Sequence, residues 1–434
     1  MKTLAVVITS VSTVLFLTFF SVGTHRVGIQ NSEPEKGCVF NTTMGIENSK
    51  EYAKHKTPEK VVKSIDEALA WMSMAQHKDG GWGAGSHARQ GVIDPHAVEP
   101  DPATTSMVGM ALLRNGTTLE SGTFRVQLGK AVEYILLQVE ESSPNSLNIT
   151  EITGTQIQTK LGQNIDVVLA SQFLTNLLEK LPANYNEKAR ISKALNVCVA
   201  KIQRGQHQDG STKGAGWAGV LQSSLASNAL EAAEYAGADV DVKKLEQARQ
   251  YQKDNFDAET GNVNTDKGAG VVLYAVSGSA RSSAKEARKV KEALEEAGDL
   301  RQMPSRGRSQ VTVDDLRAIG YAEDEAIKGA TAYNVYENAK QTAQRSDVVS
   351  GFGNNGGEEF LSFLQTGEGL VIAKDDSWRT WYDDVSGKMV KIQNQDGSWN
   401  GHHCITSPVF CTATCLLILS IENDLQNLQT MGGS

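Results

Sequence analysis

Acidic, imidazole and thiol side chains gather in two short segments near the C-terminus of this 434-residue chain. One segment reads GGEEFLSFLQ and the other reads GHHCITSPVFC. Their candidate site residues are Glu358, Glu359, His402, His403, Cys404 and Cys411. Zinc accepts carboxylate, imidazole and thiolate ligands, so Glu358, His403, Cys404 and Cys411 could hold a metal ion. The alternative is structural, because carboxylates stabilise helix starts and buried thiols commonly pack as small apolar groups.

These segments belong to a pattern that recurs at spacings of roughly 50–65 residues, typical of a helical repeat. Each unit is an amphipathic helix, a glycine-rich turn and an apolar helix, as in SIDEALAWMSMAQHKDGG followed by DPATTSMVGMALLRNG. Neither helix can bury its apolar face alone, so neighbouring units must stack. The sequence therefore predicts an all-α fold, an (α/α)6 toroid of about six helical hairpins, with an open solenoid of the same helices as the alternative.

In a closed ring, the inner helices begin near one rim, where first-turn side chains and free N–H groups converge on a central pit. Glu358 stands at the predicted start of the fifth inner helix, and Cys411 at that of the sixth. Because these two units are consecutive, they adjoin in the ring. We therefore expect Glu358, His403, Cys404 and Cys411 to line one concavity.

The turns carry a motif of their own, as KDGGW, QDGSTKGAGW and QDGSW show. The last of these, with Gln395, Asp396, Gly397 and Trp399, resembles the glutamine–tryptophan repeat motif of squalene and oxidosqualene cyclases. The match is looser at His77–Trp82 and Gln208–Trp217. The resemblance implies the prenyltransferase and squalene-cyclase (terpenoid cyclase) repeat superfamily, without identifying a specific family. It predicts that Gln395 and Trp399 pack at a joint between repeats, with Trp399 buried.

A second resemblance concerns the site. Protein prenyltransferase β-subunits hold a catalytic zinc ion through Asp, Cys and His, and the two C-terminal segments resemble the segments that carry these ligands. Glu358 falls at the Asp position and Cys411 at the His position, but Phe360 occupies the Cys position. The resemblance thus implies zinc as the possible cofactor, at a site rebuilt from neighbouring residues, and no other cofactor.

Several motifs of related enzymes are absent. The sequence has no DxDD motif, its nearest string being at Asp239–Asp241, and no GCGEQ thioester or GxSxG elbow. Aromatic residues are only 6% of the chain, few for a cavity that stabilises carbocations. Three hypotheses follow: a toroid that binds a small molecule or protein in its central pit, a metal-assisted enzyme using Glu358, His403 and Cys411, or an isoprenoid-processing transferase or cyclase. Whether the chain is an enzyme stays open.

The N-terminus predicts export. An apolar run from Leu4 to Phe20 follows Lys2, so residues 1–23 are interpreted as a signal peptide or signal anchor. Residues 24–55 read as a polar linker, and residues 56–434 as the toroid. We expect a periplasmic or extracellular protein, or one held at the membrane only by this N-terminal segment. A net charge of −9 argues against a nucleic-acid partner.

Overall fold

The computed structural model describes residues 57–298, 310–350 and 356–431, and within them the chain forms helical hairpins. Six outer helices are α3 (Glu59–Met74), α5 (Arg125–Glu141), α8 (Lys188–Arg204), α10 (Val242–Asp254), α13 (Glu323–Gln344) and α16 (Trp378–Ile392). Each precedes an inner helix, in order α4 (Pro102–Arg114), α7 (Ile165–Lys180), α9 (Gly219–Tyr235), α11 (Val272–Glu296), α15 (Glu359–Ile372) and α17 (Pro408–Leu419). Among the described residues the only extended pairing is in isolated β-bridges.

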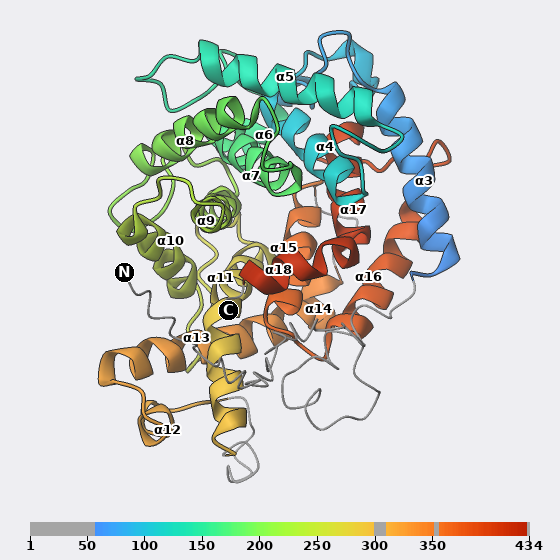
Figure 1. Cartoon of the computed structure of the whole chain (residues 1–434). Helices are drawn as coiled ribbons and strands as arrows, with labels where there is room; N and C mark the ends of the chain where they lie inside the picture. Colours follow the sequence, from blue (N-terminus) through green and yellow to red (C-terminus); the bar gives the residue numbers. More distant parts are fainter. Residues whose placement is uncertain (1–56, 299–309, 351–355, 432–434) are drawn as a thin grey trace, which may run out of the picture. The chain divides into compact units, whose positions relative to one another are not determined.

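The inner helices form a closed ring. Each packs on the next in the order α4, α7, α9, α11, α15 and α17, and α17 returns to α4 (Figure 1). The outer helices of the last and first hairpins also meet, because α16 contacts α3, and the inner helix α17 contacts α3 as well. The prediction of an (α/α)6 toroid is therefore confirmed over the described residues, and the open solenoid is wrong.

Local sequence explains where the inner helices begin. Asp101 caps α4 by accepting a hydrogen bond from Thr104 N at 2.8 Å, and Pro102 opens its first turn. Ser407 and Pro408 start α17 in the same way. Every residue of α4 and α17 is buried, because these helices are covered on all sides by the ring and the outer layer.

The fold also contains short helices that the repeat pattern does not predict. They are η1 (His87–Arg89), η2 (Pro95–Ala97), α6 (Gln156–Lys160), α12 (Val313–Ala318), α14 (Ser346–Val349), η4 (Ile421–Asp424) and α18 (Leu425–Met431). Two of them matter below. α6 precedes α7 at the rim where the inner helices begin, and α18 packs on α9 and α15.

Three equivalent glutamines tie neighbouring outer helices together. The Nε2 group of Gln393 donates to Gly397 O at 2.8 Å and to Ser64 O of α3 at 2.9 Å. Gln76 makes the same pair of bonds to Gly80 O and Gln127 O, and Gln206 bonds Gly210 O and Lys244 O. The bond from Gln393 to α3 joins the last hairpin to the first, so this motif stabilises ring closure.

The glutamine that joins the repeats is therefore a different residue from the one predicted from the sequence. Gln395 is exposed, and the joint is made two residues earlier by Gln393, because that residue ends α16 and faces the next hairpin. Trp399 is buried as predicted, at 1% exposure, with its Nε1 donating to Met389 O. Trp217 is 61% exposed, so the tryptophan assigned to the third turn has no staple role.

The glycine of each turn is required by close packing. Gly397 has a φ of 93°, and a Cβ there would lie 2.8 Å from Glu67 O of α3. Asp396 completes the turn, since its Oδ1 accepts from Ser398 N at 3.0 Å. Gly80 and Gly210 share the positive φ and the close approach to a backbone carbonyl. Only glycine combines this conformation with such a contact at no steric cost.

The predicted signal segment and polar linker lie outside the described residues. Within the described part of the chain, no single helix is long and apolar enough to cross a membrane; α17 with Ile421–Thr430 meets the length and composition test only as a pair bent by 64°.

Candidate functional site

Glu358 lies at the rim where the inner helices begin, as the N-cap residue of α15, and it is 1% exposed. Its Oε1 accepts a hydrogen bond from Tyr274 Oη at 3.2 Å and pairs with Lys160 Nζ at 2.9 Å. Its Oε2 is buried and has no partner among the described residues. A Cβ at Gly356 would meet that Oε2 at 2.2 Å, so glycine leaves room for the carboxylate. The rim thus holds a buried ion pair with one unsatisfied oxygen.

Lys160 is the residue that sequence reasoning missed at this rim. It is the last residue of α6, a five-residue helix started by a capping box in which Thr155 and Gln158 bond each other's backbone. The ammonium also lies 3.6 Å from Cys404 Sγ and 5.7 Å from the ring centroid of Trp217. A capping-box pattern in TQIQTK is the only signal that could have located it.

The two thiols at the rim are neutral packing groups. Burial raises the pKa of Cys404, the Glu358 carboxylate raises it further, and Lys160 only partly opposes them. Burial, with Glu358, also raises the pKa of Cys411 well above its usual range. Cys404 has a left-handed φ of 61°, a conformation that costs energy in a residue other than glycine. A thiol with a raised pKa is a poor nucleophile near neutral pH.

The other predicted site residues are placed differently. Glu359 is buried beside Glu358, whereas His402 and His403 are exposed and their Nδ1 atoms lie 3.2 Å from each other. The expected concavity is thus only partly assembled. Glu358, Cys404 and Cys411 come together, but the imidazoles point into solvent, because the turn before Cys404 directs them outward.

The residues at the rim do not fit a zinc ion. Within the described ranges, no group of three or more His, Cys, Asp and Glu side chains is arranged to hold a metal ion. Lys160 Nζ lies within hydrogen-bonding distance of the Glu358 carboxylate. Phe360 stands where prenyltransferase β-subunits have their cysteine ligand, and its side chain is buried. A cationic ammonium here supplies the positive charge that a metal would bring. The zinc hypothesis gains no support from this geometry and stays a prediction.

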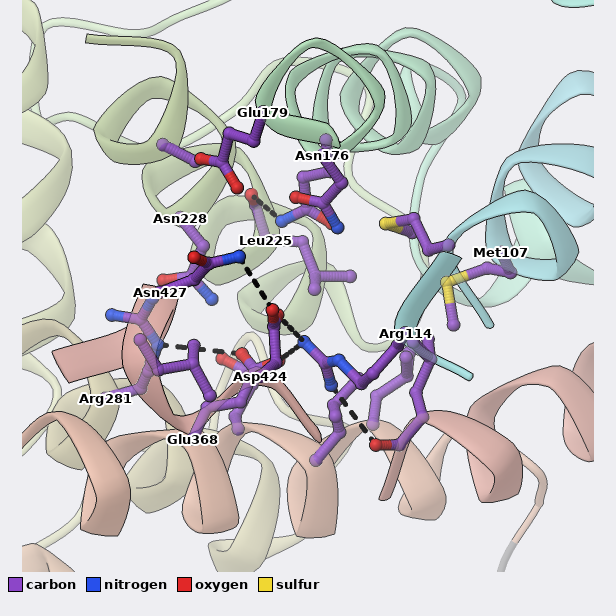
Figure 2. Close-up of a pocket in the computed structure, with 18 residues that line it drawn as sticks. Met107, Arg114, Asn176, Glu179, Leu225, Asn228, Arg281, Glu368, Asp424 and Asn427 are labelled. Carbon is purple, nitrogen blue, oxygen red and sulfur yellow. Dashed lines mark hydrogen bonds and ion pairs between the residues drawn. The ribbon is translucent and has the colours of Figure 1, made fainter. Parts of the chain in front are cut away.

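A second candidate site lies at the opposite end of the ring. Glu368 is ten residues after Glu358 on the same inner helix, which corresponds to about 15 Å along its axis. All six inner helices and the η4–α18 segment line a cavity of about 60 Å³ at this level, and we call it the axial cavity. Its lining residues are Met107, Met110, Arg114, Gln172, Asn176, Glu179, Leu225, Asn228, Ala232, Arg281, Leu361, Leu364, Gln365, Glu368, Leu417, Asp424, Asn427 and Leu428 (Figure 2).

One side of the axial cavity is an ion-pair network. Arg114 lies 2.7 Å from Glu368 and 3.4 Å from Asp424, and its Nη1 donates to Leu417 O at 3.1 Å. Arg281 Nε lies 3.7 Å from Glu368, and its Nη1 donates to Glu231 Oε2 at 2.9 Å. Figure 2 shows Arg114, Arg281, Glu368 and Asp424 directed toward one another. These four charges form one ion-pair network, in which the Nε atoms of Arg114 and Arg281 have no hydrogen-bond partner among the described residues.

Other residues that line the axial cavity carry polar groups without partners among the described residues. Gln365 is 1% exposed; its Oε1 accepts from Ser224 Oγ, but its Nε2 has no partner among the described residues. Asn176 and Asn228, which Figure 2 places across the cavity from Glu368, have side chains that form no hydrogen bond within the described part of the chain. Glu179 lies beside them but is itself exposed to solvent; partial desolvation and the Asp424 carboxylate raise its pKa, and Lys180 opposes them. The axial cavity therefore offers unsatisfied hydrogen-bonding groups to a ligand.

Comparison with known proteins gives a likeness of fold. No protein-family model and no curated protein matches the chain. It is similar to the apo structure of the type II terpene cyclase MstE from Scytonema, at 11% identity and a TM-score of 0.32, covering 85% of this chain and 99% of that one. A variant of that cyclase in complex with geranylgeranyl dihydroxybenzoate gives 13% identity and a TM-score of 0.33, covering 85% and 98%. Likeness at this level carries no argument about reaction or ligand.

Sequence reasoning missed the axial cavity altogether. Each inner helix contributes between one and four of its lining residues, and these helices are far apart in the sequence. The η4–α18 segment, which also lines the cavity, follows the last repeat. A useful signal was available in three inner helices, where Arg114, Arg281 and Glu368 stand among apolar or small residues. Charges in such positions must meet partners across the ring.

Proposed function

We propose that this chain is an exported binding protein that holds a small polar ligand in the axial cavity. The observation that carries the proposal is the buried Nε2 of Gln365, which has no partner among the described residues, with the buried side chain of Asn228 and the half-buried side chain of Asn176 in the same lining. Unpaired buried polar groups cost free energy. A ligand that hydrogen-bonds to them recovers that energy and is held by it.

The size of the axial cavity limits the ligand. A water molecule needs roughly 15 Å³ of cavity measured in this way, so 60 Å³ accommodates about four non-hydrogen atoms. Sites for larger organic ligands are typically about 300–1,000 Å³. An isoprenoid chain does not fit this closed ring, which disfavours the transferase or cyclase hypothesis.

The rim at Glu358 supports an enzyme less well. Its ionisable groups pair with each other, its thiols have raised pKa values, and its imidazoles lie in solvent. Metal-assisted chemistry would need Lys160 to leave Glu358. We therefore assign the Glu358–Lys160 pair a structural role, in joining α15 to α6.

Export is the second part of the proposal, and it rests on residues 1–23. The test is fractionation of a secreting host that expresses the full chain and a variant lacking these residues. We expect only the full chain outside the cytoplasm. Equal distribution of the two forms would refute export, and N-terminal sequencing of the exported form would distinguish a cleaved signal from an anchor.

Binding is tested with a set of small polar probes, namely ethylene glycol, acetamide, glycolate and ethanolamine, by saturation-transfer NMR and titration calorimetry. Ala232→Trp places a large ring in the lining of the axial cavity, and Ala318→Trp, at an exposed position on α12, is the control. We expect binding of at least one probe that Ala232→Trp abolishes and Ala318→Trp leaves intact. Binding insensitive to Ala232→Trp, or none at all, would contradict the proposal, provided that circular dichroism shows both variants folded.

A further inference from the structure

We propose that the ligand of the axial cavity is a small neutral carbonyl compound, whose oxygen accepts hydrogen bonds from Gln365 and from the arginines of the ion-pair network. This inference rests on the proposed binding function and names the chemical class of its ligand. It follows from the kind of polar atom left unpaired in the lining, from the balance of charge around the cavity, and from the cavity's apolar walls and size.

The unpaired polar atoms buried in the lining are all hydrogen-bond donors. Among the described residues, the buried side-chain nitrogen and oxygen atoms of the lining that lack a hydrogen-bond partner are Gln365 Nε2, Arg114 Nε and Arg281 Nε. These three residues are 1%, 8% and 3% exposed, respectively. Amide and guanidinium nitrogens donate hydrogen bonds and do not accept them. A ligand that satisfies these atoms must therefore present an acceptor.

The carboxylates of the network do not satisfy the two Nε atoms. Both Nη atoms of Arg114 have acceptors, whereas its Nε has none among the described residues. Arg281 donates from Nη1 to Glu231 Oε2 at 2.9 Å, but its Nε lies 3.7 Å from Glu368 Oε2, which is beyond hydrogen-bonding distance. Each guanidinium group thus keeps one N–H available to a ligand acceptor.

The charges around the cavity favour a neutral ligand. Three arginines and three carboxylates, all with side chains no more than 14% exposed, form the ion pairs Arg114–Glu368, Arg114–Asp424, Arg281–Glu231 and Arg249–Glu231. Lys180 and Glu179, both exposed at the end of α7, add one charge of each sign. A charged ligand would add an uncompensated charge to this balanced set, and burying such a charge is costly.

A carbonyl group suits a surplus of donors better than a hydroxyl group does. A carbonyl oxygen has two lone pairs and brings no hydrogen that needs an acceptor. An alcohol or a water molecule also accepts hydrogen bonds, but it adds donors of its own, so the surplus remains. Asn176 and Asn228, in the same lining, each carry both a donor and an acceptor and favour neither group.

The walls and the size of the cavity limit the rest of the ligand. Met107, Leu225 and Leu361 are among the apolar lining residues, and they offer contacts to methyl groups. At roughly 15 Å³ for each non-hydrogen atom, the 60 Å³ cavity accommodates about four. Acetone and acetamide have this size, so acetamide is the compound that we expect to bind among the polar probes above.

The first experiment compares four probes that share a skeleton of the same size and shape: acetone, 2-propanol, acetate and isopropylammonium. Saturation-transfer NMR and calorimetric titration of the full chain measure their binding. We expect acetone to bind most tightly. 2-Propanol should bind about tenfold more weakly, the scale of one hydrogen bond left unmade. Acetate and isopropylammonium should show no detectable binding, because each brings an uncompensated charge.

The second experiment removes one donor. Gln365→Met keeps most of the side-chain volume but lacks Nε2, so it should weaken acetone about tenfold. Ser224→Ala removes the hydrogen bond that Gln365 Oε1 accepts and leaves Nε2 in place, so it should not change the affinity. Gln395→Met, the same substitution at an exposed position, is the second control. Circular dichroism and melting curves show whether the variants are folded.

The outcomes separate the ligand class from the binding site. Acetate, isopropylammonium or 2-propanol binding as tightly as acetone would overturn the carbonyl class, and so would acetone binding that a folded Gln365→Met variant leaves unchanged. The site itself would stand in those cases if Ala232→Trp still blocked binding. If Gln365→Met does not fold, the order of the four probes on the wild type decides the class. Failure of every probe would overturn both the class and the site.

Discussion

Replacing Lys160 with methionine should expose how much the rim depends on its buried ion pair. Lys160→Met keeps most of the side-chain volume but removes the ammonium that lies 2.9 Å from Glu358 Oε1. Glu358 is 1% exposed, so its carboxyl must then either stay charged without a cation or take up a proton. Breaking a buried pair in this way typically costs about 3–5 kcal/mol.

Proton uptake sets the expected pH dependence. Glutamate side chains ionise in water near pH 4.3, so protonating one costs about 3.7 kcal/mol at pH 7 and about 1 kcal/mol at pH 5. The free energy of unfolding of Lys160→Met should therefore fall below that of the wild type by about 3.7 kcal/mol at pH 7 and by much less at pH 5. The sign follows because the folded variant binds a proton that the unfolded chain releases above pH 4.3.

Urea unfolding curves at pH 5, 6 and 7 measure this difference. Lys78→Met, at an exposed lysine without a charged partner, is the control and should change little. The double variant Lys160→Met with Glu358→Gln removes the orphaned charge and should lose the pH dependence. A loss of stability equal at all three pH values, or no loss at all, would refute the structural role of the pair.

The ring itself yields three more expectations. Trp399→Ala should destabilise the fold by about 3–5 kcal/mol and Gln393→Ala by about 2 kcal/mol, whereas the same change at Gln395 should be silent in urea unfolding. Burial and the Asp101 carboxylate raise the pKa of Asp166 to about 7. The free energy of unfolding should therefore fall as pH rises from about 4 to 7, by up to about 1.4 kcal/mol per pH unit. Asp166→Asn should flatten a plot of melting temperature against pH. Elemental analysis after refolding with excess zinc should find no bound metal, and metal that Cys411→Ser releases would restore the zinc hypothesis.

The fold could be predicted from the sequence because the same pattern of outer helix, glycine-rich turn and inner helix recurs in every repeat. Apolar spacing, repeated from one unit to the next, indicated the outer and inner helices. The turn motif was shifted by two residues, since glutamine stands at both 393 and 395 before the same Asp–Gly pair. The choice between them depends on where α16 ends, which local sequence determines poorly.

The candidate site was only partly predictable. Consecutive repeats brought Glu358 near Cys404 and Cys411, as expected. Lys160 escaped notice because α6 is too short to show a periodic pattern, and its partner is nearly 200 residues away in sequence. The axial cavity depends on ring closure and on the C-terminal helix α18, which follows the last repeat. Such contacts are properties of the closed ring and of no single segment.

The most direct test of the account is a crystal structure of the protein grown with a saturating concentration of the polar probe that binds most tightly. We predict density for the probe in the axial cavity, with a polar atom within hydrogen-bonding distance of Gln365 Nε2. Density at the Glu358–Lys160 rim instead, or an axial cavity that holds only water at saturation, would contradict the central claim.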